Sequence, residues 1–301
     1  MPRRFGLPSV YAAAALATAV TTAAPVVASV VAPAGFPAPA PDEPPRPYIV
    51  TAVDRADARA LVGDARWRVR RYYTAALPGF ATLLTSAEAA ELRADPRVRA
   101  LESDDTVRAL DLATSEAPSR SPATGAGVTV YVLDTGVDVT DDRFGDRAWH
   151  AFDAAGARRR FCGEHGTRAA SLAAGEADGV APGARVGSVK VLGCDGSGDL
   201  SDVIAGLDWV RRHARRPAVV NLSVAAGRSP ALATAVRRLG RSGVAVTASP
   251  RTAGTMARHL ESHPSADTPD DATSPKFTAA RDVIRQNPSR TPNLLLHRDE
   301  R

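Results

Sequence analysis

The alternation of apolar strands with helices after Gly127 limits the fold of this chain more than any other feature of its sequence. An unbroken, mostly β-branched run predicts a buried strand at 128–133, and further strands are predicted at 185–192, 218–223 and 244–247. Helical patterns lie between these strands, at 167–174, 201–213 and 231–242. Strands and helices in this order form a parallel sheet with helices on both faces. We therefore predict an α/β domain over residues 127–301.

Residues 48–112 have the pattern of a small α+β domain. Short strands are predicted at 48–53, 69–76, 82–84, 98–101 and 106–110, the last two closing the unit. Helices are predicted at 57–62 and 86–94, and the second follows a capping-box pattern of Thr85 and Glu88. Stretches rich in Pro, Ser and Gly flank this unit and predict linkers, at 35–47 and 113–126.

Residues 1–34 have the features of an export signal. Two arginines precede a run of Ala and Val, and small residues follow that run at 32–34. A membrane anchor is the alternative, because the run approaches the length that spans a bilayer. Its weak hydrophobicity and the internal Pro25 favour a cleaved signal. We expect a secreted, extracellular protein with no membrane contact after cleavage.

The charge of the 301-residue chain is mixed along most of its length, with a formal net charge of +5. Its arginine clusters, at 158–160 and 211–212, are short and lack interleaved aromatic residues, so we expect no nucleic-acid partner. Export would place Cys162 and Cys194 in an oxidising compartment, where a disulfide can form. Two unrelated buried thiols remain an equal alternative at this point.

A carboxylate ends the first strand of the α/β region. Asp134, Thr135 and Gly136 follow the apolar run, so the acid lies at the carboxyl edge of the sheet, where open α/β folds build their sites. A turn aspartate is the alternative. Aspartic proteases also use Asp-Thr-Gly, but they need two such carboxylates, and this chain has one of these motifs in an α/β context.

His165 is the second candidate site residue. It stands at the predicted start of a helix, between Glu164 and Gly166, so its imidazole would be held rigidly. A lone histidine is more often a surface residue or a satisfied core residue. An aspartate at a strand end followed by a histidine at a helix start is, however, one of the chain orders in which serine-protease triads occur.

Taken together, these motifs resemble the subtilisin-like serine proteases, most closely those of the proteinase K and aqualysin type. The aspartate motif lies at 132–137 and the histidine motif at 165–167. Other similar stretches of the α/β region lie at 179–182, 189–192, 196–198 and 220–223. Three stretches resemble the inhibitory propeptide of such enzymes, at 48–50, 79–80 and 95–98. The similarity covers about 47–247 and, faintly, a tail that includes 291–295.

The resemblance implies a secreted, monomeric serine endopeptidase that acts on proteins and carries its own inhibitor-like propeptide at 48–112. Asp134 would orient His165, and His165 would be the general base. An extended edge would pair with substrate backbone, formed by Leu222, Ser223, Val224 and Ala225.

The same resemblance implies a disulfide between Cys162 and Cys194. No cofactor is expected. The family allows bound calcium, for which the sequence identifies no set of ligands.

The chain departs from the family where the nucleophile should stand. The family has Gly-Thr-Ser-Met-Ala, whereas this chain has Gly-Thr-Met-Ala at 254–257, with no serine between Thr255 and Met256. The oxyanion-hole asparagine is missing too, because Ala-Ser-Pro-Arg follows the strand 244–247. We infer an internal deletion after about residue 247. Thr255 as a displaced nucleophile is the alternative, although it is one residue out of register.

The deletion leads to three expectations for the end of the chain. No strand should follow 244–247, helices should lie only around 256–262 and 277–285, and the strand 244–247 should be an exposed apolar edge. The resulting prediction is a catalytically deficient protease with an incomplete sheet. A peptide-binding decoy and a non-functional gene remnant are the alternatives.

Overall fold

The computed structural model describes residues 43–64, 67–112, 122–156, 162, 164–263, 277–280 and 295–298. The predicted signal, most of both predicted linkers, the arginines at 158–160 and most of the tail motif at 291–295 lie outside these residues. Within the described part of the chain, no helix is both long and apolar enough to cross a membrane.

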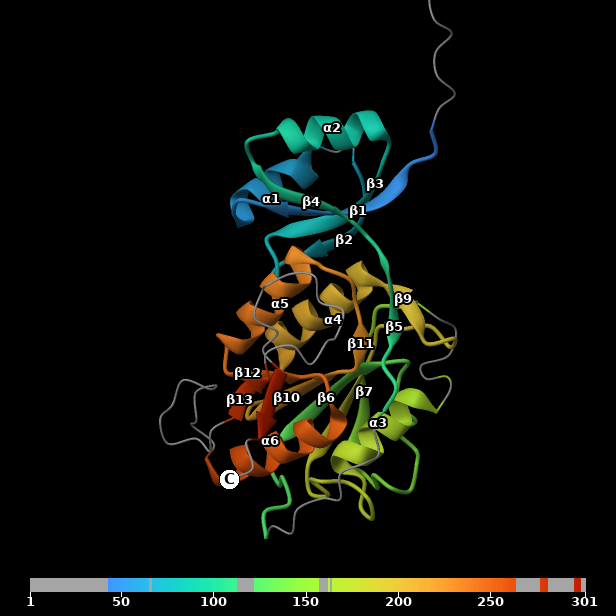
Figure 1. Ribbon diagram of the computed structural model, residues 1–301, viewed down its shortest axis with the longest axis vertical. Coiled ribbons are helices and arrows are strands. Elements are labelled where there is room, and N and C mark those ends of the chain that lie inside the picture. Colours follow the sequence, from blue (N-terminus) through green and yellow to red (C-terminus); the bar gives the residue numbers. More distant parts are fainter. Residues whose placement is uncertain are drawn as a thin grey trace, which may run out of the picture. The chain divides into compact units, whose positions relative to one another are not determined.

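The N-terminal unit is an antiparallel sheet packed against two helices (Figure 1). Its strands have the order β2-β3-β1-β4 and are β1 (Arg46–Ala52), β2 (Arg68–Tyr73), β3 (Gly79–Leu84) and β4 (Val98–Ser103). The helices are α1 (Arg55–Gly63) and α2 (Ser86–Ala94). The predicted capping box begins α2: the Thr85 hydroxyl accepts the N–H of Glu88, whose carboxylate accepts the N–H of Thr85.

Alternate residues of this small sheet face two different cores. Val50 and Phe80 pack with α1 and α2, whereas Ile49 and Ala81 join the core of the α/β region. The two sets alternate because successive side chains of a strand point to opposite faces. Both faces of the two central strands, β1 and β3, are therefore buried over most of their length.

The fifth predicted strand does not close this sheet, contrary to our expectation. β5 (Thr106–Ala109) lies instead between β11 (Val224–Ala225) and β9 (Ser197–Asp199) in a separate antiparallel sheet. β9 and β11 are too short to be seen as periodic patterns. Their pairing with β5 joins segments that are far apart in the sequence.

Five parallel strands form the central sheet, in the order β12-β10-β6-β8-β7. They are β6 (Thr129–Asp134), β7 (Ala148–Asp153), β8 (Arg185–Lys190), β10 (Ala218–Leu222) and β12 (Val244–Thr247). The parallel sheet confirms the predicted fold class. β7 was not predicted, because it is a half-buried edge strand whose sequence, Ala-Trp-His-Ala-Phe-Asp, has no β-branched run.

Helices cover both faces of the central sheet, as predicted. Two of them, α3 (His165–Ala174) and α6 (Pro250–Ser262), pack on the face that holds Val130 and Val132. The other two, α4 (Leu200–His213) and α5 (Pro230–Gly240), pack on the face that holds Tyr131 and Leu133. All six residues of β6 are buried for this reason.

Helix α6 begins six residues before the helix we expected around 256–262. Ser249 and Pro250 explain the early start, since serine favours the N-cap position and proline the first helical position. The helix covers one face of β12, where Ala245 is buried, and α5 covers the other, where Val244 is buried. β12 lies at the edge of the central sheet, as expected, but its apolar side chains are covered on both faces, so the predicted exposure of this edge is wrong.

The expectation that no strand follows Thr247 is also wrong. β13 (Phe277–Ala280) and β14 (Leu295–Arg298) pair antiparallel in a two-stranded sheet. Residues 277–280 were predicted to be helical, because their local pattern carries no information about a distant pairing partner.

Candidate catalytic site

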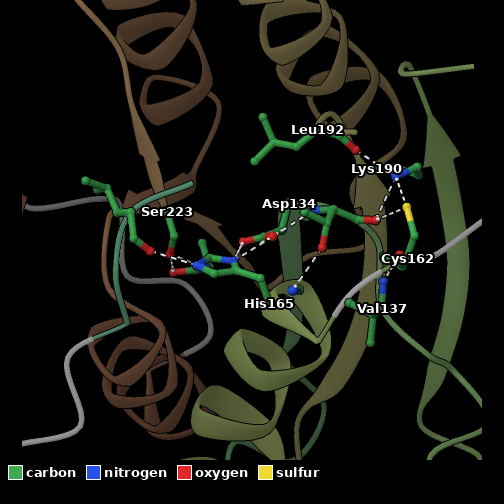
Figure 2. Close-up of polar contacts among 12 residues, drawn as sticks. Asp134, Val137, Cys162, His165, Lys190, Leu192 and Ser223 are labelled. Carbon is green, nitrogen blue, oxygen red and sulfur yellow. Dashed lines mark hydrogen bonds and ion pairs between the residues drawn. The ribbon is translucent and has the colours of Figure 1, made fainter. Parts of the chain in front are cut away.

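Asp134 and His165 meet at the carboxyl end of β6 (Figure 2). Nδ1 of His165 lies 2.8 Å from Oδ1 and 2.9 Å from Oδ2 of Asp134. The Asp134 side chain is fully buried, whereas that of His165 is 26% exposed. The carboxylate also accepts the N–H of Thr135 at 2.6 Å. A buried carboxylate thus holds one ring nitrogen of a partly accessible imidazole.

Two glycines allow the strand end and the helix start to approach this closely. Gly136 has φ +94°, a conformation that favours glycine, and it turns the chain after β6. A Cβ on Gly166 would lie 2.2 Å from the carbonyl oxygen of Gly136. The Thr135 hydroxyl accepts the N–H of Gly166 at 3.1 Å and so caps α3 from outside, since Glu164 provides no side-chain cap. These contacts fix His165 at the first position of the helix.

Lys190 braces the same corner from the end of β8. Its buried ammonium donates to the carbonyl oxygens of Thr135 at 2.8 Å and Leu192 at 2.7 Å, and lies 3.2 Å from Sγ of Cys162 (Figure 2). Burial lowers the pKa of Lys190. Cys162 forms a disulfide with Cys194, which ties the loop before His165 to the loop after β8.

The second ring nitrogen of His165 is also occupied. Nε2 lies 2.7 Å from the carbonyl oxygen of Leu110, just after β5. A carbonyl has no proton to donate, and the carboxylate of Asp134 accepts at Nδ1, so both ring nitrogens must donate. The hydrogen bond to Asp134 is the main reason that the pKa of His165 is raised; the Leu110 carbonyl adds to it. In this arrangement the ring is an imidazolium and has no free nitrogen for a nucleophile.

Three of the four predicted substrate-edge residues contact the propeptide segment. Val224 and Ala225 form β11 and pair with β5, and the carbonyl of Ser223 accepts the N–H of Leu110 at 2.9 Å. Leu222 lies instead at the end of β10 in the central sheet, where it pairs with β6. β9 pairs with the other side of β5, so residues 106–109 lie as an extended strand between two edges.

The stretch that replaces the family's nucleophile motif lies inside α6. The Thr255 hydroxyl donates to the carbonyl of Arg251, four residues earlier in the same helix, at 3.0 Å. Gly254 packs against α3, where a Cβ would lie 2.6 Å from the carbonyl oxygen of Ala173. Thr255 and Met256 are therefore held in the second turn of a packed helix and not at its start.

Two contacts of the site were missed in the sequence. Leu110 was assigned to a propeptide strand, and nothing local indicates that its carbonyl reaches His165. The position of Lys190 could have indicated its contacts, because a buried cation inside the apolar run Val189–Leu192 needs polar partners. Among the described residues, no group of three or more His, Cys, Asp or Glu side chains is arranged to hold a metal ion.

Comparisons with known proteins agree with the two-part organisation. The family described as "Peptidase inhibitor I9" matches residues 49–110, and the "Subtilase family" matches residues 125–254. The chain is 41% identical over 209 residues to an extracellular serine proteinase of Thermus sp., covering 64% of this chain and 51% of that protein. It is 34% identical over 201 residues to alkaline serine exoprotease A of Vibrio alginolyticus, covering 59% of this chain and 38% of that protein.

Among solved structures, the fold is similar to that of fervidolysin from Fervidobacterium pennivorans, a keratinolytic enzyme related to subtilisin. The TM-score is 0.55 at 19% identity, over 69% of this chain and 40% of that chain. The chain thus spans about half or less of the length of the proteins described in these comparisons.

Proposed function

Because this chain belongs to the subtilase family of serine proteases and carries the inhibitor-type propeptide of such enzymes, we propose that it is a catalytically deficient member of the family. The observation that carries this proposal is that the stretch in place of the family's nucleophile motif lies inside α6, where the Thr255 hydroxyl donates to the carbonyl of Arg251. Nε2 of His165, which would take the proton of a serine hydroxyl, is bonded to the carbonyl of Leu110 in the propeptide segment. Asp134 would thus orient a histidine that has no nucleophile to activate.

The missing groups make the expected loss of activity large. Loss of the nucleophile from a triad of this kind lowers kcat by roughly a millionfold, and loss of one oxyanion donor lowers it by about 10²–10³. Thr255 is a poor substitute, because its hydroxyl already donates within α6. The two losses need not add, and loss of the nucleophile alone is sufficient to abolish ordinary proteolysis.

The test combines the mass of the purified full chain with turnover of a generic peptide substrate. We expect an uncut chain between residues 110 and 126 and no turnover above that of the His165→Ala variant. Labelling with a fluorophosphonate, which reacts with activated serines, should also be absent. A chain cut in this region, with turnover that His165→Ala removes, would disprove the deficiency and indicate an unrecognised nucleophile.

A second candidate function is peptide binding without cleavage. The specific observation is that β5 lies between β9 and β11, so these two strands form a strand-binding groove in which an extended segment pairs along both of its edges. After the linker is cut by an added protease, a fluorescent peptide of residues 104–112 should bind, and a version with proline at positions 107 and 108 should not, because proline lacks the N–H that the edges need. Equal binding of the two peptides would rule out strand addition.

We also propose that the protein acts outside the cell. The disulfide is consistent with an oxidising compartment, and the Thermus relative is described as extracellular. Fractionation of the native host should place the mature chain, without residues 1–34, in the medium. Recovery of the reduced, full-length chain from the cytoplasm would contradict this assignment.

A further inference from the structure

The propeptide and the α/β region are matched in charge at one end of α4 and α5. Asp104 accepts the N–H of Ser201 at the start of α4 at 2.8 Å. Glu102 accepts the N–H of Ala231 at the start of α5 at 3.0 Å. Helix N-termini carry partial positive charge, so propeptide carboxylates meet positive ends.

Ion pairs strengthen the contact at the same end. Arg71 of β2 lies 2.8 Å from Asp202 in the first turn of α4, and Arg70 lies 3.2 Å from Asp199 just before it. Each charge that the propeptide presents in these four contacts meets its opposite.

The other end of the two helices has the reverse character. The C-termini of α4 and α5 are adjacent, because Nε of Arg211 donates to the carbonyl of Arg238 at 3.2 Å. Arg241 follows at the C-cap position of α5. The α/β region thus presents a group of arginines where these helices end.

The propeptide adds arginines to this group, and none of its described acids forms an ion pair with them. Arg55 at the start of α1 donates to the carbonyl of Ala75, in the turn held against α4, at 3.4 Å. Arg99 of β4 donates to the carbonyl of Val53 at 3.3 Å. The acid nearest to Arg55 in sequence, Asp54, uses its carboxylate to cap α1.

The five side chains Arg55, Arg99, Arg211, Arg238 and Arg241 therefore form one cationic cluster across the interface. Arg238 is half-buried, and burial is the main reason that its pKa is lowered. The charges of Arg55, Arg211, Arg99 and Arg241 lower this pKa further, in that order. Their recorded hydrogen bonds go to backbone carbonyls. Within the described part of the chain, no ion pair links any of the five to a carboxylate.

We propose that this cluster, Arg55 and Arg99 of the propeptide with Arg211, Arg238 and Arg241 of the α/β region, is a binding site for a phosphate-type oxyanion. Guanidinium groups match the oxygens of phosphate in paired hydrogen bonds. An anion held between the two parts would replace repulsion across the interface with attraction to both sides. It would therefore strengthen the hold of the propeptide, whether or not the site at His165 has any activity.

The experiment measures thermal unfolding of the full chain at constant ionic strength and pH, with chloride replaced stepwise by inorganic phosphate. We expect phosphate to raise Tm more than chloride does. The Arg238→Ala variant should weaken the apparent affinity at least about tenfold, the effect of losing one charge-assisted contact. Arg237→Ala is the matched control, because this neighbour on α5 contacts Thr234 and lies outside the cluster.

A second pair of variants keeps the test valid if Arg238→Ala folds poorly. Arg55→Ala should reduce the phosphate response, whereas Arg59→Ala, exposed on the same helix, should not. Vesicles with phosphatidic acid form a separate arm, in which cosedimentation lost on Arg55→Ala would assign the site to a lipid headgroup. Equal responses to chloride and phosphate, or equal losses in the cluster and control variants, would overturn the proposal.

Discussion

Asp208 on α4 holds the turn between β2 and β3 of the propeptide through a single buried carboxylate. Oδ1 accepts the backbone N–H groups of Thr74 at 3.0 Å, Ala75 at 2.6 Å and Ala76 at 2.7 Å. Oδ2 lies 3.2 Å from Nε of Arg212. Asp208, Ala75 and Ala76 are almost fully buried, so water has little access to these groups.

We predict that Asp208→Ala destabilises the full chain by about 3–5 kcal/mol. The substitution leaves the buried N–H groups of Ala75 and Ala76 without an acceptor, and each such group costs about 1–3 kcal/mol. The N–H of Thr74 is more exposed and adds less. Asp208→Asn keeps an acceptor oxygen of the same shape and loses only the charge, so it should cost about 1–2 kcal/mol.

The assay is equilibrium unfolding in guanidinium, with hydrogen exchange at residues 74–76 as a local readout. Asp141→Ala is the matched control, because it removes an Asp–Arg pair whose arginine is 44% exposed, and such a pair contributes less than about 1 kcal/mol. The reasoning would be refuted if Asp208→Ala cost no more than the control, or if Ala and Asn variants lost the same stability. Unchanged exchange at 74–76 would refute it as well.

Three further predictions concern the corner that holds His165. Because the pKa of His165 is raised by its partners, its stabilising contribution is present below the unfolded value of about 6.5 and is lost as pH rises through the folded value. Between pH 6 and pH 9, Tm should therefore fall less in His165→Ala than in the parent. The exposed control His213→Ala should behave like the parent, and parallel Tm profiles in all three proteins would contradict this prediction. Replacing both Cys162 and Cys194 with serine should cost about 3–4 kcal/mol for a sequence separation of 32, and dithiothreitol should cause a similar loss in the parent but none in the variant. Gly166→Ala brings a methyl group within 2.2 Å of a backbone oxygen and should lower the free energy of unfolding by about 1–3 kcal/mol, as measured by denaturant unfolding. An unchanged midpoint would show that the turn adjusts to the methyl group without loss of stability.

Local sequence determines the parts of the fold that could be predicted. The buried strand at 129–134, the capping box of α2 and the amphipathic α4 each depend on neighbouring residues. Local rules placed Asp134 at the carboxyl edge of the sheet and His165 at a helix start; that the two side chains meet was implied only by the resemblance to the subtilisin-like proteases. The parallel sheet and its two helical layers were therefore expected and are present.

The parts that could not be predicted depend on distant partners. β5 leaves the propeptide sheet because β9 and β11 offer it two edges, and neither strand has a pattern of its own. The contact of Leu110 with His165 follows from that pairing. The length of α6 was underestimated, although Ser249 and Pro250 are residue types that favour the N-cap and the first helical position.

The strand that fills the groove is part of the same polypeptide as the groove, and this gives it an advantage in competition. A tethered segment behaves as a ligand at an effective concentration in the millimolar range when the linker is short. A free peptide of equal intrinsic affinity would have to reach that concentration to displace β5 from half of the molecules. A cut between Leu110 and Gly125 would remove the covalent tether on one side and leave β5 held through the packing of the propeptide on α4 and α5. The tether and this packing, and not the affinity of the groove alone, therefore set the concentration of foreign peptide needed to displace β5.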